Sequence, residues 1–202
     1  SLYRVTRSLI ALESLPTMLH LVVEQVTEAL PADSVLLITL DFERRRVVHF
    51  VIGGDEERIS HVSYEELMVG LTGWVVKEKR PALSPAGKVD PREGEAARRL
   101  RVEGESGAII VAPLLYRGEV LGTMTAINSL DGPDFTERDV DLMMAMANQA
   151  AVAIENARLV RGLEAKVAAR TAEIRAEQEK SEIILRSVGD AIAMVDRGMR
   201  VQ

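Results

Sequence analysis

The sequence predicts an α+β fold: a central antiparallel β-sheet with helices on both faces, flanked by long N- and C-terminal helices. Two pairs of β-rich segments are each joined by a short polar turn, which is typical of hairpins. A third observation is a run from Asp139 to Leu185 with no proline, a single glycine (Gly162) and many strong helix formers. The rest of the chain is organised around this long helix.

The composition is that of an ordinary globular protein. The chain has 202 residues, of which 47% are hydrophobic and 28% charged, and its net charge of −6 gives no support for nucleic-acid binding. It contains no cysteine, which excludes disulfides, thiolate nucleophiles and thioether-attached pigments. No apolar run approaches the 18 residues of a membrane span. We expect a cytoplasmic fragment of a longer protein, with no membrane contact of its own.

The N-terminal region predicts two helices. Leu2, Val5, Leu9 and Leu12 step by 3, 4 and 3 residues, which is the spacing of a coiled-coil seam. A second helix begins near Pro16, which suits the first turn of a helix. It has an amphipathic face and ends at Pro31.

The middle of the chain alternates between strands and short helices. Pro113 falls inside one strand, so we expect an edge position or a bulge there. The helical piece at 64–79 is expected to break around Gly70 and Gly73. The predicted strands are 34–40, 46–52, 81–84, 107–116 and 120–128, and the predicted helices are 64–79 and 92–102.

The long helix begins with a clear signal and then changes character. Thr136 is a good N-cap, with Asp139 three residues later in place of the usual glutamate of a capping box. Apolar residues are dense in 140–154, so this half is expected to pack on the domain. From Val160 onward they thin to a single stripe, which predicts a weak parallel seam with a partner helix.

The stripe is offset from the apolar positions that precede it. The step from Ala157 to Val160 is three residues instead of four, which resembles a stammer in a coiled coil. Arg170, Glu177 and Ser181 occupy seam positions where apolar residues would be better. A solvated helix with incidental apolar residues is the alternative. The residues expected at a homodimer interface are Leu2, Val5, Leu9, Leu12, Met143, Ala150, Ile154, Val160, Leu163, Val167 and Ile174.

Three passages resemble the GAF domain family. Residues 71–76 (LTGWVV) followed by 79–81 (KRP) resemble one family passage, and 112–114 (APL) followed by 118–123 (GEVLGT) resemble its hairpin. Residues 135–139 (FTERD) and 150–157 (AAVAIENA) resemble its closing helix. The tail at 184–196 (ILRSVGDAIAMVD) resembles the opening of a PAS domain up to its first strand.

These resemblances imply a domain plan. Residues 1–15 form an entering coiled-coil helix and residues 16–160 the GAF domain. Residues 161–183 form a coiled-coil signalling helix, and residues 184–202 the truncated start of a PAS domain. The order resembles that of bacterial sensor histidine kinases in two-component systems, with the output domain outside this fragment.

The GAF resemblance also implies a pocket between the sheet and the 64–102 region. Phe50, Trp74, Ser84, Ile110 and Thr125 are its expected lining, although the same residues could simply fill the core. Cyclic-nucleotide binding is an alternative function: the family's signature for it is matched at Asn128, Phe135 and Asp139, but Ser129 and Val140 depart from it. Haem ligation by His20, His49 or His61 is a further alternative, and no pair of them has metal-ligand spacing.

The function expected from the sequence is a non-enzymatic, regulatory sensory module. It would bind a small molecule of unknown identity, relay a signal through a dimeric helix, or do both. The rival from another class is a ligand-free dimerisation spacer, which a closed and fully apolar pocket would favour. Free-methionine-sulfoxide reductases share the GAF fold, but they depend on cysteines that this chain lacks.

Overall fold

The computed structural model describes residues 15–54, 63–88, 90–95, 98 and 107–198, with only the backbone described at 176, 179 and 181–198. The predicted α+β fold is confirmed. The described elements are α2 (Leu15–Ala29), β1 (Ser34–Asp41), β2 (Arg46–Gly54), α3 (Tyr64–Val69), α4 (Leu71–Glu78), β3 (Ala82–Ser84), β4 (Ile109–Tyr116), β5 (Glu119–Ile127) and α6 (Glu137–Gly198).

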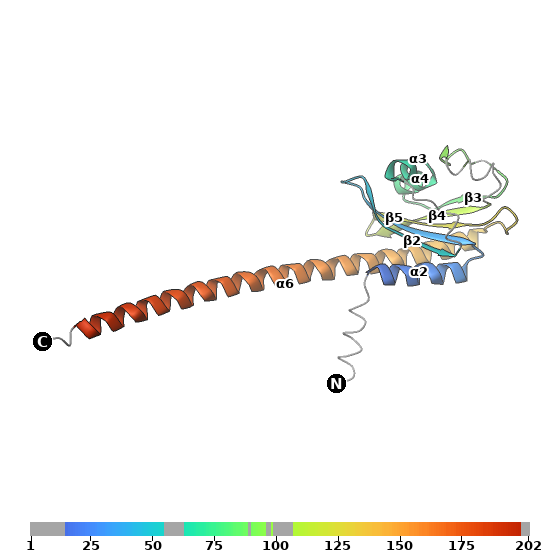
Figure 1. The fold of residues 1–202 in the computed structure, drawn as a ribbon. Helices are drawn as coiled ribbons and strands as arrows, with labels where there is room; N and C mark the ends of the chain where they lie inside the picture. Colours follow the sequence, from blue (N-terminus) through green and yellow to red (C-terminus); the bar gives the residue numbers. More distant parts are fainter. Residues whose placement is uncertain (1–14, 55–62, 89, 96–97, 99–106, 199–202) are drawn as a thin grey trace, which may run out of the picture. The chain divides into compact units, whose positions relative to one another are not determined.

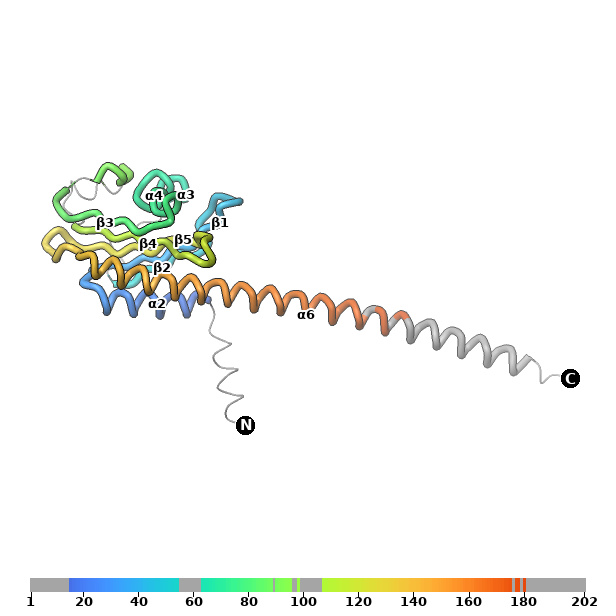
Figure 2. The backbone as a smooth tube through the Cα atoms, turned by 180° about the vertical axis from the view of Figure 1, so that it is seen from behind, coloured from blue at the N-terminus to red at the C-terminus, as the bar shows by residue number. Residues whose placement is uncertain are grey.

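The five strands form one antiparallel sheet in the order β2-β1-β5-β4-β3. Helices α3 and α4 lie over one face, and α2 and the first part of α6 lie side by side over the other (Figures 1 and 2). The turn between β4 and β5 has positive φ at Arg117 (50°) and Gly118 (83°). That conformation matches the twist of paired strands, which explains the tight hairpin.

The face beneath α2 is closed by apolar residues. Leu19, Val23 and Val26 are buried along one side of the helix, at the spacing that the amphipathic pattern predicted. Gly53 of β2 permits the close approach, because a Cβ there would lie only 2.6 Å from Val23 Cγ1.

Pro113 lies within β4, as the sequence indicated, at a point where the strand is locally an edge. β3 pairs with β4 only as far as Val111, so the missing N–H of Pro113 costs no hydrogen bond to β3. The register with β5 shifts just beyond it, between Leu114 and Leu115. Both expectations for this proline, an edge position and a nearby irregularity, are therefore met.

The start of α6 follows the predicted cap. Thr136 N and Oγ1 both donate to Asp139 Oδ2 at 2.7 Å, and Asp139 N donates weakly to Thr136 Oγ1 at 3.4 Å. The carboxylate also lies in the first turn, where the helix dipole favours negative charge.

The end of α6 differs from the expectation. The backbone is helical as far as Gly198, so helix is present where the PAS resemblance implies a first strand. A lone strand has no neighbour to satisfy its backbone, whereas extending an existing helix adds one hydrogen bond for each residue ordered.

The chain divides into two compact units, residues 1–155 and 156–202. The helix at 92–102 falls mostly outside the described residues, and within it Glu95 and Arg98 are helical. The break at Gly70 separates α3 from α4, but Gly73 lies inside α4. In the part of the chain that the structure describes, no helix is long and apolar enough to cross a membrane.

Candidate functional site

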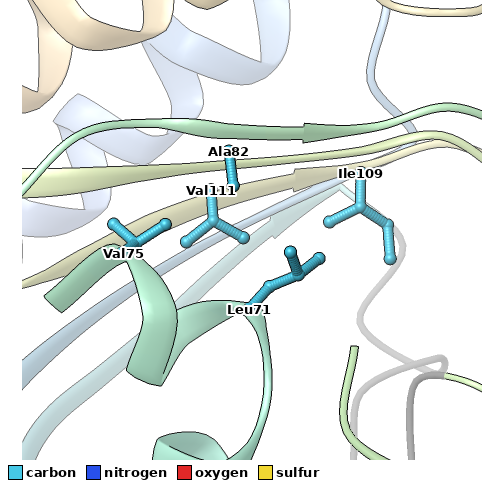
Figure 3. Close-up of a cluster of buried hydrophobic side chains, with 5 residues drawn as sticks. All are labelled: Leu71, Val75, Ala82, Ile109 and Val111. Carbon is cyan, nitrogen blue, oxygen red and sulfur yellow. The ribbon is translucent and has the colours of Figure 1, made fainter. Parts of the chain in front are cut away.

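The strand register assigns each sheet residue to one of two faces. Figure 3 shows the apolar side chains that meet between α4, β3 and β4, namely Leu71, Val75, Ala82, Ile109 and Val111. One row of paired residues continues this α4 face across all five strands: Ala82, Val111, Thr125, Leu36 and Ile52. The α4 face is therefore packed at its β3–β4 end, and its remaining surface lies over β1, β2 and β5.

Four of the five residues expected to line a pocket lie on or beside the α4 face. Phe50 and Thr125 belong to it by register, and both are half-buried even though Thr125 is on the central strand. Ser84 belongs to it on β3 and is fully buried. Trp74 comes from α4 and packs, half-buried, against the apolar cluster.

Ile110 lies on the opposite face, which corrects the fifth assignment. It pairs with Ala126, which pairs with Val35, which in turn pairs with Gly53 beneath α2. Because β4 is buried on both faces from Ile109 to Leu114, no alternation in the sequence shows which residues face α4. Ile110 is therefore a core residue on the α2 side.

Trp74 is in contact with two arginines. The guanidinium carbons of Arg80 and Arg92 lie 4.8 and 4.6 Å from the centre of its ring, within cation–π range. Arg92 is held by Asp90 at 2.6 Å and donates to the Leu83 carbonyl at 3.1 Å. The hydrogen bond to Asp90 raises the pKa of Arg92, so this cation is permanent.

A buried polar pair lies at the β3 end of the α4 face. Ser84 Oγ donates to Glu93 Oε1 at 2.6 Å, and Glu93 is only 3% exposed. Sequence reasoning selected Ser84 but missed Glu93, because a glutamate at the start of a charged predicted helix gives no sign of burial. The pair brings a carboxylate into an otherwise apolar layer.

Thr123 adds a second polar position to the α4 face. It pairs with Ile38 and Pro113 and is fully buried. Its hydroxyl has no hydrogen-bond partner among the described residues. Thr125, two residues further along β5, is a second polar residue on the same face.

The residues that match the nucleotide-binding signature have structural roles here. Asn128 is buried, accepts a hydrogen bond from Asp33 N at 3.2 Å and donates to the Pro133 carbonyl at 2.6 Å. Phe135 is buried, and Asp139 caps α6. Together they hold the loop that leads from the sheet into the long helix.

His20 and His49 lie on α2 and β2, the two elements that line one groove. His20 is exposed on α2, and His49 shares a 2.8 Å hydrogen bond between its Nδ1 and Thr39 Oγ1. His61 lies outside the described residues. Within the described ranges, no group of three or more acidic or histidine side chains could hold a metal ion.

The expected dimer residues divide into two classes. Met143, Ala150 and Ile154 are fully buried in the first unit, so they are core residues and are unavailable to a partner. In the second unit Val160, Leu163, Val167 and Ile174 are all exposed, Leu163 by 62% and Val167 by 64%. Leu2, Val5, Leu9 and Leu12 lie outside the described residues.

A groove that the sequence did not indicate lies between α2 and β2. Its volume is about 610 Å³. Leu21 of α2 and Val48 of β2 expose apolar surface in it, at 45% and 40%. The lining residues are Pro16, Thr17, His20, Leu21, Glu24, Val48, His49, Phe50 and Val51.

Comparison with protein families identifies the domain. The GAF domain model matches residues 14–154, well over half of the chain. A search of curated proteins finds no match.

Solved structures agree with this assignment. The GAF domain of a phosphoenolpyruvate-protein phosphotransferase from Acinetobacter is 23% identical with a TM-score of 0.60, covering 80% of this chain and 94% of its own. The GAF-B domain of DevS from Mycobacterium smegmatis is 21% identical with a TM-score of 0.57, covering 74% and 99%. A methyl-accepting chemotaxis protein is 18% identical with a TM-score of 0.59, covering 73% and 92%. At these identities the likeness establishes the fold alone.

Proposed function

We propose that this chain, which belongs to the GAF domain family, is the sensory module of a multidomain signalling protein and passes its signal through a homodimeric helix. GAF domains are regulatory sensory modules of signalling proteins, and that general role is the premise. The resemblance of the tail to a PAS opening supports a sensor histidine kinase as the parent protein.

One observation carries the helical part of the proposal. Val160, Leu163, Val167 and Ile174 follow one another at steps of 3, 4 and 7 residues, and each is about half exposed or more. This spacing places them on one stripe of a coiled-coil helix. The stripe is self-complementary, so a second copy of α6 is the natural partner to cover it.

The seam is weak, which suits a switch. Arg170 and Glu177 occupy seam positions and are exposed on the helix. Polar residues at such positions lower the stability of a coiled coil, so two arrangements of the helices can lie close in free energy. A change at the domain would then need to supply only a small differential free energy to favour one arrangement.

The α4 face is the proposed ligand site. Phe50, Trp74 and Thr125 lie on or beside this face, which also carries the buried Thr123 hydroxyl and the Ser84–Glu93 pair. A bound polar molecule would satisfy the Thr123 hydroxyl, whose burial is otherwise costly. These polar groups favour a small metabolite over a ligand-free spacer. The structural roles of Asn128 and Asp139 give no support for a cyclic nucleotide.

Native mass spectrometry of the intact chain tests both parts. We expect a dimer, and the double variant Leu163→Asp/Val167→Asp should be monomeric because it places charges in the seam. Val69→Asp is the matched control, since Val69 is an apolar residue exposed by 75% on α3. A chain that is monomeric without substitution would refute the dimeric relay.

The ligand is tested in the same spectra. We expect extra mass on the freshly purified chain, and Thr125→Phe should remove it by filling the surface beneath α4. The dimer should remain in that variant, because Thr125 is far along the sequence from the seam. A bare mass for the unsubstituted chain would favour the spacer.

A further inference from the structure

The outward side of α6 lacks charge where the helix packs on the first unit. Between Asp141 and Glu155 the sequence has no charged residue, although 28% of the whole chain is charged. The outward side of a helix that covers a domain is normally polar and charged, so this stretch is not an ordinary solvent-facing surface. Its exposed residues, which together form the uncharged face, are Leu142, Ala145, Asn148, Gln149 and Val152.

Two members of the uncharged face are large apolar residues. Leu142 is 37% exposed and Val152 is 47% exposed. At about 100° of rotation per residue, these two side chains lie about 80° apart around the helix. The buried residues Met143 and Ile154 lie on the side that faces the core. This part of α6 therefore has two apolar sides, and the domain covers only one of them.

Four members of the uncharged face also have the spacing of a coiled coil. They follow one another at steps of 3, 4 and 3 residues, namely Leu142, Ala145, Gln149 and Val152. Such steps place them at successive a and d positions, with Gln149 at an a position. A regular stripe of this kind suits another helix lying alongside.

We propose that the uncharged face is the surface on which two copies of this domain pair, with their α6 helices parallel and in register. The inference rests on the proposed homodimer and names where the domains themselves touch. A twofold axis brings the same patch of each copy together. Charged residues near that axis would repel their counterparts, and this face has none. Depletion of charge also distinguishes the centre of a protein interface from the rest of the surface.

Gln149 favours the parallel arrangement over the antiparallel one. In a parallel pair it lies opposite its own counterpart, and because a side-chain amide both donates and accepts, the two can hydrogen-bond to each other. In an antiparallel pair centred on the same stretch, Gln149 lies opposite Ala145, which leaves the amide without that partner. A polar residue at an a position specifies register at some cost in stability. Gln149 is thus the residue that fixes the register of the two domains.

Sedimentation equilibrium of the full chain tests the pairing. In Val152→Asp, the dimer dissociation constant should rise by about tenfold or more, because two carboxylates then face each other across the interface. Leu130→Asp is the matched control, since Leu130 is also 47% exposed in the first unit but lies outside α6. Thermal unfolding of both variants checks that each remains folded.

The result separates this inference from the proposed function. A dimeric chain whose dissociation constant changes equally in the two variants would overturn the pairing face and leave the α6 seam standing. The uncharged face would then serve a different partner. An unsubstituted chain that is monomeric would overturn both.

Cysteine cross-linking tests the orientation, because the chain contains no native cysteine. Val152→Cys should form a disulfide between copies about tenfold faster than Leu130→Cys, because a parallel pair in register brings the two Cβ atoms to the distance of about 4 Å that a disulfide needs. Equal rates would overturn the pairing. Faster linking in a mixture of Leu142→Cys and Val152→Cys chains than in Val152→Cys alone would show an antiparallel pair.

The role of Gln149 has a separate readout. Gln149→Leu should lower the dimer dissociation constant by about tenfold, because an apolar residue at an a position stabilises a coiled coil. Asn148→Leu is the control, since Asn148 is exposed beside the stripe but occupies neither an a nor a d position. An unchanged or higher dissociation constant in Gln149→Leu would place Gln149 outside the interface.

Discussion

At the scale of single residues, Gly122 of β5 shows how closely the central strands approach. A Cβ at this position would lie 1.9 Å from the Ile38 carbonyl oxygen and 2.8 Å from Thr39 Cα. Both obstacles are backbone atoms of β1, so no side chain can move aside. The central pairing of the sheet therefore requires glycine here.

We predict that Gly122→Ala destabilises the domain by about 3 kcal/mol, the upper range for overpacking a core. The midpoint of chemical unfolding, followed by tryptophan fluorescence of Trp74, measures the change. Gly162→Ala is the control, because nothing lies within 4 Å of a Cβ there. A shift in the Gly122 variant no larger than in the Gly162 variant would contradict the argument.

Asn128 is a second residue whose role is positional. Its side chain bridges Asp33 N and the Pro133 carbonyl, and Ser129 N donates to Asp33 Oδ2 at 2.5 Å. These bonds join the start of β1 to the loop that enters α6.

We predict that Asn128→Ala costs about 1 kcal/mol, because it removes the hydrogen bond from this buried side chain to the Pro133 carbonyl. Thermal unfolding measures the loss. Ser129→Ala, which keeps the backbone donor to Asp33, should cost far less. Equal costs would indicate that the Asn128 side chain does not hold the loop.

At the scale of elements, α3 depends on a reciprocal cap. Ser63 N and Oγ donate to Glu66 Oε2 at 2.8 and 2.7 Å, and Glu66 N donates to Ser63 Oγ at 3.3 Å. The hydrogen bond from the Ser63 side chain, followed by that from its backbone, lowers the pKa of Glu66 below its usual value of 4.5. The cap therefore contributes its stability above the ordinary glutamate pKa and loses it as pH falls through the lowered pKa.

We predict that an NMR titration finds Glu66 below its usual pKa and that Ser63→Ala raises the value. Ser63→Thr should preserve the shift, because threonine retains the hydroxyl. An unshifted Glu66 in the unsubstituted chain would show that the cap does not form in solution.

At the scale of the whole molecule, α6 carries two groups of apolar residues, one buried and one exposed. Core residues such as Met143 and Ile154 belong to the first unit, whereas the exposed seam from Val160 onward belongs to the second. One continuous helix carries both stripes. If the exposed residues form the proposed seam, its register depends on the number of residues between them.

We predict that deletion of residues 164–170, one heptad, preserves the dimer, whereas deletion of residues 168–169 weakens it. Two residues rotate the following helix by about 200°, which moves Ile174 away from the seam. Disulfide formation between copies of Ile174→Cys measures the alignment. It should persist in the seven-residue deletion and disappear in the two-residue deletion, and the reverse result would refute the seam.

The sequence by itself determined the elements whose signals are local. The strands, the cap at Thr136, the break at Gly70 and the edge position of Pro113 depend on turns, proline chemistry and propensities within a few residues. Three motifs in the expected order were enough to identify the family. At the C-terminus the backbone is helical as far as Gly198, where the PAS resemblance implies a first strand.

The tertiary structure decided which way the apolar residues face. Ile110 belongs to the α2 side and Thr125 to the α4 side, yet β4 is apolar on both faces and carries no alternation to read. Met143 and Leu163 both belong to apolar stripes of α6, but only Met143 is buried. Burial depends on which elements pack against each part of the helix. Glu93 is buried, and the groove beside β2 forms, where segments distant in sequence pack together. A local sequence pattern does not predict such long-range contacts.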